Sequence, residues 1–141
     1  MVSDKLLQYT KDLLGCRAVL SLDVETYSSV DIGKAGMYRY TESPDFEILL
    51  LAYSYDFGPT KVIDLTREII PEGLISDILD PSVCKTAFNA AFEIACFNRR
   101  FTRLGLPPVV ASDNWFCTMV RAGSLGLPMS LDGVSGVLKL K

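Results

Sequence analysis

The feature that most constrains this sequence is an apolar segment that ends in two acids, RAVLSLDVE at residues 17–25. Its first half is apolar at consecutive positions, Ala18-Val19-Leu20, which is typical of a central strand covered on both faces. Side chains two apart on a strand point to the same face, so Asp23 and Glu25 project together. The segment therefore predicts a central strand with a pair of carboxylates near its end.

The segments that follow predict a mixed sheet with helices on its faces. Residues 47–56 and 60–65 are typical of two strands around a Phe57-Gly58-Pro59 turn, which predicts a hairpin. Short strands are expected over residues 84–88 and 114–116, each followed by a helix, and this alternation favours parallel pairing. Helices are expected over residues 3–14, from Pro71 to 79, over 90–104 and 118–124, and from Ser130 onward. Residues 26–45 are expected to form turns, with an extended piece at 37–40.

Residue types exclude several classes of site. The chain has no histidine, which excludes Ser-His-Asp catalysis, Cys-His nucleophiles and imidazole-ligated metals. Its four cysteines contain no CxxC pair and form neither a zinc-site pattern nor a disulfide framework. A reducing, intracellular compartment, the cytoplasm, is therefore expected. The longest apolar run, residues 48–52, is far too short for a membrane span, and the charged N-terminus is unlike a signal peptide.

Charge is unevenly distributed along the chain. The net charge of −3 argues against a protein that coats DNA without regard to sequence. Residues 1–93 carry 8 basic and 15 acidic side chains, whereas residues 94–141 carry 6 basic and 2 acidic ones. A basic second half is compatible with a phosphate backbone, and solvated helix faces explain it equally well.

A second motif, FNAAFE at residues 88–93, stands where a strand turns into a helix. Asn89 is a favourable N-cap type, and Glu93 lies about one turn into the helix. A fourth strand parallel to and beside the first would place Glu93 over the carboxyl end of that first strand, where α/β ligand sites gather. Taken alone, a capped helix with an acid in its first turn explains both residues. Clustered carboxylates repel unless a hard cation such as Mg²⁺ or Mn²⁺ lies between them.

The order of these motifs resembles that of the DEDD-type proofreading exonucleases, particularly the exonuclease regions of phage-like family A DNA polymerases. The family's D-x-E-T motif is matched by Asp23, Glu25 and Thr26. Its H-N-x-x-F-D motif is matched by Asn89, Phe92 and Glu93. The stretch WFCTMVRAGSLGLPMSLDGVSGVL is similar to the family segment that follows, so the likeness covers most of residues 17–140.

The resemblance implies an α/β fold of the ribonuclease H-like type, with three antiparallel strands plus parallel strands, flanked by α-helices. It implies two-metal hydrolysis at the 3′ end of single-stranded DNA, beside a polymerase domain in a longer protein. Metal ligands would be Asp23, Glu25 and Glu93. Substrate contacts would come from Thr26, Asn89 and Phe92, although helical spacing alone favours a core position for Phe92.

The sequence also departs from the family pattern. Phe88 replaces a common histidine, Glu93 replaces the usual aspartate, and Cys117 stands where an acid often precedes the threonine. The third motif, a tyrosine or histidine four residues before an aspartate, has no match and is expected beyond Lys141. Residues 1–141 are therefore expected to form a single, C-terminally incomplete exonuclease-like domain with weak activity or none.

Two alternatives remain open at this point. One is a stand-alone exonuclease that acts on RNA ends, since the contact to a ribose 2′-hydroxyl cannot be identified from sequence. The other is a non-catalytic remnant that binds single strands or docks a polymerase. The retention of both Asp23 and Glu25 opposes the remnant, because paired acids do not help a surface to bind phosphate.

Overall fold

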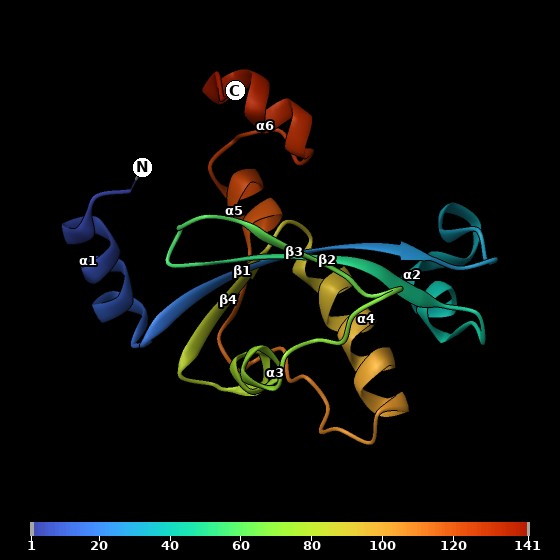
Figure 1. Cartoon of the computed structure of the whole chain (residues 1–141). Helices are drawn as coiled ribbons and strands as arrows, with labels where there is room; N and C mark the ends of the chain where they lie inside the picture. The colour runs from blue at the N-terminus through green and yellow to red at the C-terminus, as the bar shows by residue number, and fades with distance from the viewer. Residues whose placement is uncertain (1, 141) are drawn as a thin grey trace.

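A computed structural model describes residues 2–140 as a mixed sheet with helices on both faces (Figure 1). In chain order its elements are α1 (Asp4–Leu14), β1 (Ala18–Tyr27), α2 (Ile32–Glu42), β2 (Glu47–Tyr55), β3 (Lys61–Asp64), α3 (Glu72–Leu79), β4 (Val83–Ala87), α4 (Ala90–Arg103), β5 (Trp115–Cys117), α5 (Thr118–Ser124) and α6 (Leu131–Leu138). Among these described residues, no helix combines the length and apolar character that crossing a bilayer requires.

The sheet has five strands in the order β3-β2-β1-β4-β5. β1 pairs antiparallel with β2, and β2 pairs antiparallel with β3. β1 pairs parallel with β4, and β4 pairs parallel with β5. This is the ribonuclease H-like arrangement that the sequence predicted, with β1 at the centre of the sheet. The expected position of β4, parallel to and beside β1, is confirmed.

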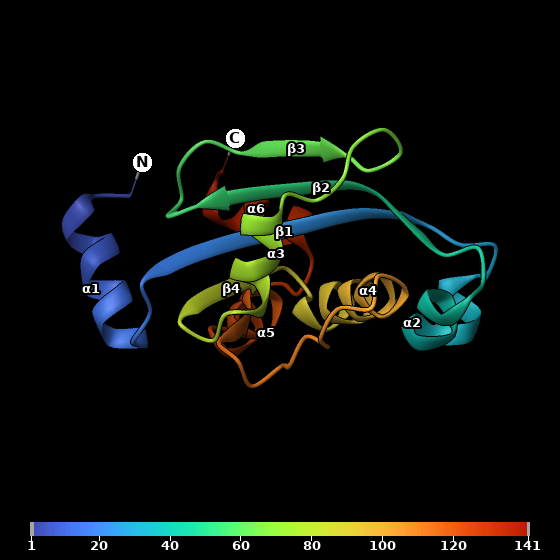
Figure 2. The ribbon, with the colours of Figure 1, turned by 60° about the horizontal axis from the view of Figure 1, so that its bottom comes forward.

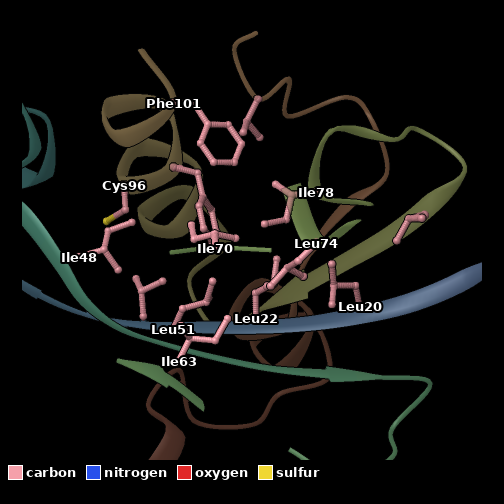
Figure 3. Close-up of a cluster of buried hydrophobic side chains, with 14 of the residues drawn as sticks. Leu20, Leu22, Ile48, Leu51, Ile63, Ile70, Leu74, Ile78, Cys96 and Phe101 are labelled. Carbon is pink, nitrogen blue, oxygen red and sulfur yellow. The ribbon is translucent and has the colours of Figure 1, made fainter. Parts of the chain in front are cut away.

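Alternation along β1 separates the main core face from an opposite face, which is buried at Val19 in a second cluster with Cys16 and Cys84 and is exposed at Asp23 and Glu25. Leu20, Leu22 and Val24 are buried, and they join the main hydrophobic cluster with Phe97 of α4 and Leu74 of α3 (Figure 3). Figures 1 and 2 show α3 and α4 on this side of the sheet and α5 and α6 on the other. Full burial of one such side chain stabilises the fold by about 1.5–3 kcal/mol. The core therefore fixes β1 and α4 rigidly relative to each other.

Most helix ends follow the signals in the sequence. The Ser3 hydroxyl accepts a hydrogen bond from the Leu6 N–H, and the Ser130 hydroxyl accepts one from the Gly133 N–H. Gly15 ends α1 with a φ of 65°, a left-handed conformation that glycine adopts without steric cost. These three positions confirm the predicted boundaries of α1 and α6.

The expectation for residues 26–45 was wrong, because much of this segment forms α2. An Asp31 carboxylate oxygen accepts hydrogen bonds from the backbone N–H groups of Gly33, at 2.9 Å, and Lys34, at 3.3 Å, and so caps the helix. Gly36 lies inside α2 with a φ of 79° and kinks it. Glycines disfavour helix by about 1 kcal/mol each, which is why the sequence pattern there did not indicate a helix.

A β-bulge interrupts the pairing of β1 with β2. Glu25 pairs with Leu50 and Thr26 pairs with Ile48, so Leu49 is the extra residue on β2. Ile48 and Leu51 are three residues apart, yet both are buried in the same core. Strict alternation would turn one of them to solvent, and the extra residue removes that conflict. The Leu49 carbonyl accepts a hydrogen bond from the Leu65 N–H at 2.8 Å.

Candidate active site

The paired acids of β1 lie on the exposed face of the sheet. Asp23 and Glu25 are both exposed, while Val24 between them is buried. They pair across the ladder with Ala52 and Leu50 of β2, immediately before the bulge. A shallow cavity of about 150 Å³ adjoins Asp23 and is lined by residues of β1, β2 and the β2–β3 turn. The predicted projection of both carboxylates to one side of the strand is confirmed.

Glu93 occupies the first turn of α4 and is almost completely buried, with 3% of its surface exposed. Its Oε2 atom is buried and has no hydrogen-bond partner among the described residues. Burial raises the pKa of the Glu93 carboxyl to about 7; its backbone N–H opposes this rise, and the negative charge of Asp23 adds to it. The acid from α4 and the first acid of β1 therefore influence each other electrostatically.

The three predicted metal ligands, Asp23, Glu25 and Glu93, do not form a compact cluster. Within residues 2–140, no three side chains of the His, Cys, Asp and Glu types stand close enough together to hold a metal ion. Only Asp23 acts on the pKa of Glu93, and Glu25 does not contribute. The donor set nevertheless suits a hard divalent cation, because it consists of carboxylate oxygens and one of them is buried without a partner.

Asn89 occupies the N-cap position of α4, but its side chain makes no capping hydrogen bond. The expectation that it caps the helix was therefore wrong. Its backbone is left-handed, with φ 76° and ψ 52°, and its side chain is exposed. A non-glycine residue in this conformation costs on the order of 1–3 kcal/mol and is often found at functional sites. Asn89 thus lies at the strand-to-helix turn from which Glu93 follows.

Thr26 and Phe92 are connected through a residue that the sequence did not single out. The hydroxyl groups of Thr26 and Tyr40 lie 2.9 Å apart. The Tyr40 ring packs against Phe92 at 6.1 Å and against Phe46 at 5.8 Å between ring centroids. Phe92 also packs against the main core, as its helical spacing indicated. A helical interpretation of residues 32–42 would have directed attention to Tyr40.

Cys117 lies at the end of β5, where it pairs with Ala87 at the end of β4. Burial raises the pKa of its thiol, but backbone N–H groups of Val120, Ala90, Asn89 and Met119 outweigh burial and lower the pKa overall. The sulfur therefore lies where the N–H groups at the starts of α4 and α5 converge.

Comparison with known proteins agrees with this architecture. No protein-family model matches the sequence. The chain is 49% identical over 122 residues to a DNA polymerase of Bacillus phage SP02, a match that covers 86% of this chain and 18% of the polymerase. It therefore spans less than a fifth of the length of that relative.

Solved structures share the fold at low sequence identity. The catalytic core of RRP6 from Trypanosoma brucei matches with a TM-score of 0.60 and 17% identity, over 100% of this chain and 34% of that one. Brucella melitensis NrnC with bound Mg²⁺ matches with a TM-score of 0.59 and 16% identity, over 87% and 54%. Escherichia coli RNase D, an exoribonuclease, matches with a TM-score of 0.53 and 18% identity, over 92% and 29%. The chain therefore has the ribonuclease H-like fold that these nuclease structures share, and it is related in sequence to a segment of a phage DNA polymerase.

Proposed function

We propose that this domain hydrolyses phosphodiester bonds at the 3′ ends of single-stranded DNA in a metal-dependent reaction, as the proofreading part of a DNA polymerase. The observation that carries the proposal is the buried carboxyl of Glu93. One of its oxygens has no hydrogen-bond partner, and burial together with the negative charge of Asp23 raises its pKa. A buried, unpaired carboxylate is costly in a purely structural role. The relationship to a phage DNA polymerase supports DNA as the substrate.

Asp23, Glu25 and Glu93 are the residues that would hold Mg²⁺ or Mn²⁺. A bound divalent ion lowers the pKa of a coordinated water and offsets charge on the phosphate. Burial raises the pKa of Glu93 to about 7 in the metal-free chain, so a bound ion would have to displace a proton from this carboxyl near neutral pH. Activity should therefore rise with pH through neutrality.

Substrate contacts in this proposal come from residues that adjoin the acids in the sequence. The Thr26 hydroxyl is oriented by Tyr40, and the Phe92 ring packs on that same tyrosine. Asn89 is exposed at the start of α4, with its amide not used in capping. These three residues would contact the terminal nucleotide and hold it against the acids. Because the family pattern uses a fourth carboxylate, we expect weak Mn²⁺ binding and slow hydrolysis from this chain.

The test is hydrolysis of a 5′-labelled single-stranded DNA oligonucleotide by the purified chain in Mn²⁺, followed on a sequencing gel. A ladder that shortens from the 3′ end is expected, and Asp23→Ala and Glu93→Gln should abolish it. A matched RNA oligonucleotide examines the sugar preference, with faster loss of DNA expected. Unchanged hydrolysis by Asp23→Ala would show a contaminating nuclease and contradict the proposal.

Metal-dependent stability provides a second readout that needs no turnover. Mn²⁺ should raise the melting temperature of the wild-type chain, since a ligand that binds only the folded state stabilises it. The rise should disappear in Asp23→Asn and in Glu93→Gln. Identical metal effects in the wild type and both variants, with no ladder, would rule out the nuclease.

A non-catalytic single-strand-binding module is the second candidate. The observation that favours it is the lack of a compact group of three acids within residues 2–140. It predicts equal affinity for single-stranded DNA with and without Mn²⁺. The nuclease predicts tighter binding when the ion is present, because the ion offsets repulsion between the acids and the phosphates.

A further inference from the structure

A cavity of about 270 Å³ lies between α2 and α4, apart from the paired acids of β1. Its lining includes Tyr38 and Glu42 of α2 and Arg99 and Thr102 of α4. Figure 1 shows α2 beyond the end of the sheet, beside α4. The cavity thus combines an aromatic ring, a guanidinium and a carboxylate.

Arg99 is the unusual member of this group. Its Nε atom is buried and has no hydrogen-bond partner, and among residues 2–140 no acid lies within 4.0 Å of its guanidinium. Arg103, one turn further along α4, instead donates to the backbone carbonyls of Phe46 and Pro44. A buried donor that lacks an acceptor is destabilising, and an anion bound in the cavity would supply an acceptor for Arg99.

The position of Arg99 relates the cavity to the carboxylates. Arg99 follows Phe92 by seven residues, which is two turns on the same face of α4 and about 10 Å along the helix axis. Long side chains of a helix lean toward its N-terminus, so the guanidinium lies on the side of Phe92. Tyr40 packs on Phe92, and Tyr38, two residues earlier on α2, is 66% exposed. Tyr38 and Arg99 therefore line a cavity between the same two helices, α2 and α4, that carry the contact of Tyr40 with Phe92.

We propose that Tyr38 and Arg99 form a subsite for the single-stranded nucleic acid that leads to the carboxylates. Arg99 binds a phosphodiester group upstream of the terminal nucleotide, and Tyr38 stacks on an adjacent base. A planar guanidinium suits phosphate oxygens, and stacking on an exposed aromatic ring accepts any base. This inference rests on the proposed function, because the nuclease site determines which end of the nucleic acid lies at the carboxylates.

Glu42 provides a test that separates ligand binding by Arg99 from a purely structural role of Arg99. Its exposed carboxylate lines the same cavity and does not pair with Arg99. It therefore repels an incoming phosphate, and Glu42→Gln should tighten binding while Arg99→Gln weakens it. If Arg99 only supported the fold, Glu42→Gln would not change affinity for nucleic acid.

The experiment measures binding of fluorescein-labelled dT12 and U12 to the whole chain by anisotropy, in EDTA, over a range of NaCl concentrations. Arg99→Gln should weaken binding about tenfold at 0.1 M salt. It should also reduce the slope of log K against log salt by about 0.7, the value for one contact with a single strand. Arg99→Lys should restore most of the slope, and Tyr38→Ala should lower affinity about tenfold with the slope unchanged.

Arg67→Gln is the matched control, since it removes the same charge from a side chain that is 83% exposed in the segment between β3 and α3. Melting temperatures verify that each variant folds. Three results would overturn the subsite. They are unchanged affinity in Arg99→Gln, an equal loss of affinity in Arg67→Gln, and no binding of either oligonucleotide by the wild-type chain. EDTA prevents hydrolysis, so this binding experiment is independent of the hydrolysis assay. Failure of the subsite and failure of the proposed nuclease activity can therefore be distinguished.

Discussion

The negative charge of Asp23 on β1 acts on the buried carboxyl of Glu93 on α4, and with burial it brings the pKa of Glu93 to about 7. The two residues are 70 positions apart in the sequence and belong to two separate motifs. β4 pairs parallel with β1, so α4, which follows β4, begins at the same end of the sheet as Asp23.

This pair predicts a specific pH dependence of stability in the absence of metal. The pKa of Glu93 is about 4.5 unfolded and about 7 folded, so the folded state holds the extra proton between these values. Stability should therefore fall as pH rises from about 4.5 to about 7, by about 3 kcal/mol, and stay level above. Urea unfolding in EDTA measures this. The Glu93→Gln side chain stays neutral, so this variant should not lose stability as the pH rises. It should therefore be more stable than the wild-type chain at pH 8.

Removing the charge of Asp23 should shift that transition. In Asp23→Asn the pKa of Glu93 falls toward its ordinary value, because the repulsion that opposes ionisation is gone, although burial remains. The midpoint of the stability-against-pH curve should move to lower pH. Glu25→Asn serves as the control, since Glu25 does not contribute to this pKa. Equal shifts in both variants would contradict a specific coupling between Asp23 and Glu93.

The Thr26–Tyr40 contact should be measurable as a coupling energy. Tyr40→Phe retains the ring contacts with Phe46 and Phe92 and removes only the hydroxyl, so it should cost about 1 kcal/mol of stability. Thr26→Val should cost a similar amount. In the double variant the two losses should not add, because both remove the same hydrogen bond. Tyr9→Phe, at a tyrosine that is 63% exposed, should have no effect.

Cysteine reactivity should single out Cys117. Backbone N–H groups overcome burial and lower the pKa of its thiol, whereas burial raises the pKa of Cys84 to about 12 and that of Cys96 still further. Cys117 is also the one cysteine of the four that is not buried. Iodoacetamide at pH 8 should therefore modify Cys117 first, as peptide mass spectrometry would show. Faster labelling of Cys84 or Cys96 would contradict this order of thiol reactivity.

Periodicity and capping residues were sufficient to predict most of the fold. The consecutive apolar residues Ala18-Val19-Leu20 gave the central strand, and the two-residue period of a strand gave the common direction of Asp23 and Glu25. The hairpin, the strand–helix alternation and the serine caps followed from local chemistry. Such signals act over a few residues and can be identified without knowledge of tertiary contacts.

The remaining features depend on tertiary structure. α2 contains Gly33 and Gly36 and is held in place by packing of Tyr40 rather than by helix propensity. Asn89 has a cap-type side chain but a left-handed backbone and no capping hydrogen bond. The burial of Glu93 also depends on how α4 meets the sheet. Sequence motifs identified these acids as candidates and could not give their surroundings.

The bulge at Leu49 has a consequence for how this region tolerates changes in length. Deleting Leu49 would leave Ile48 opposite Thr26 and Leu50 opposite Glu25 in a regular ladder, with every side chain on its present side. Inserting one more residue next to it would instead turn Ile48 outward and Glu47 inward. At this point β2 can therefore lose one residue more safely than it can gain one.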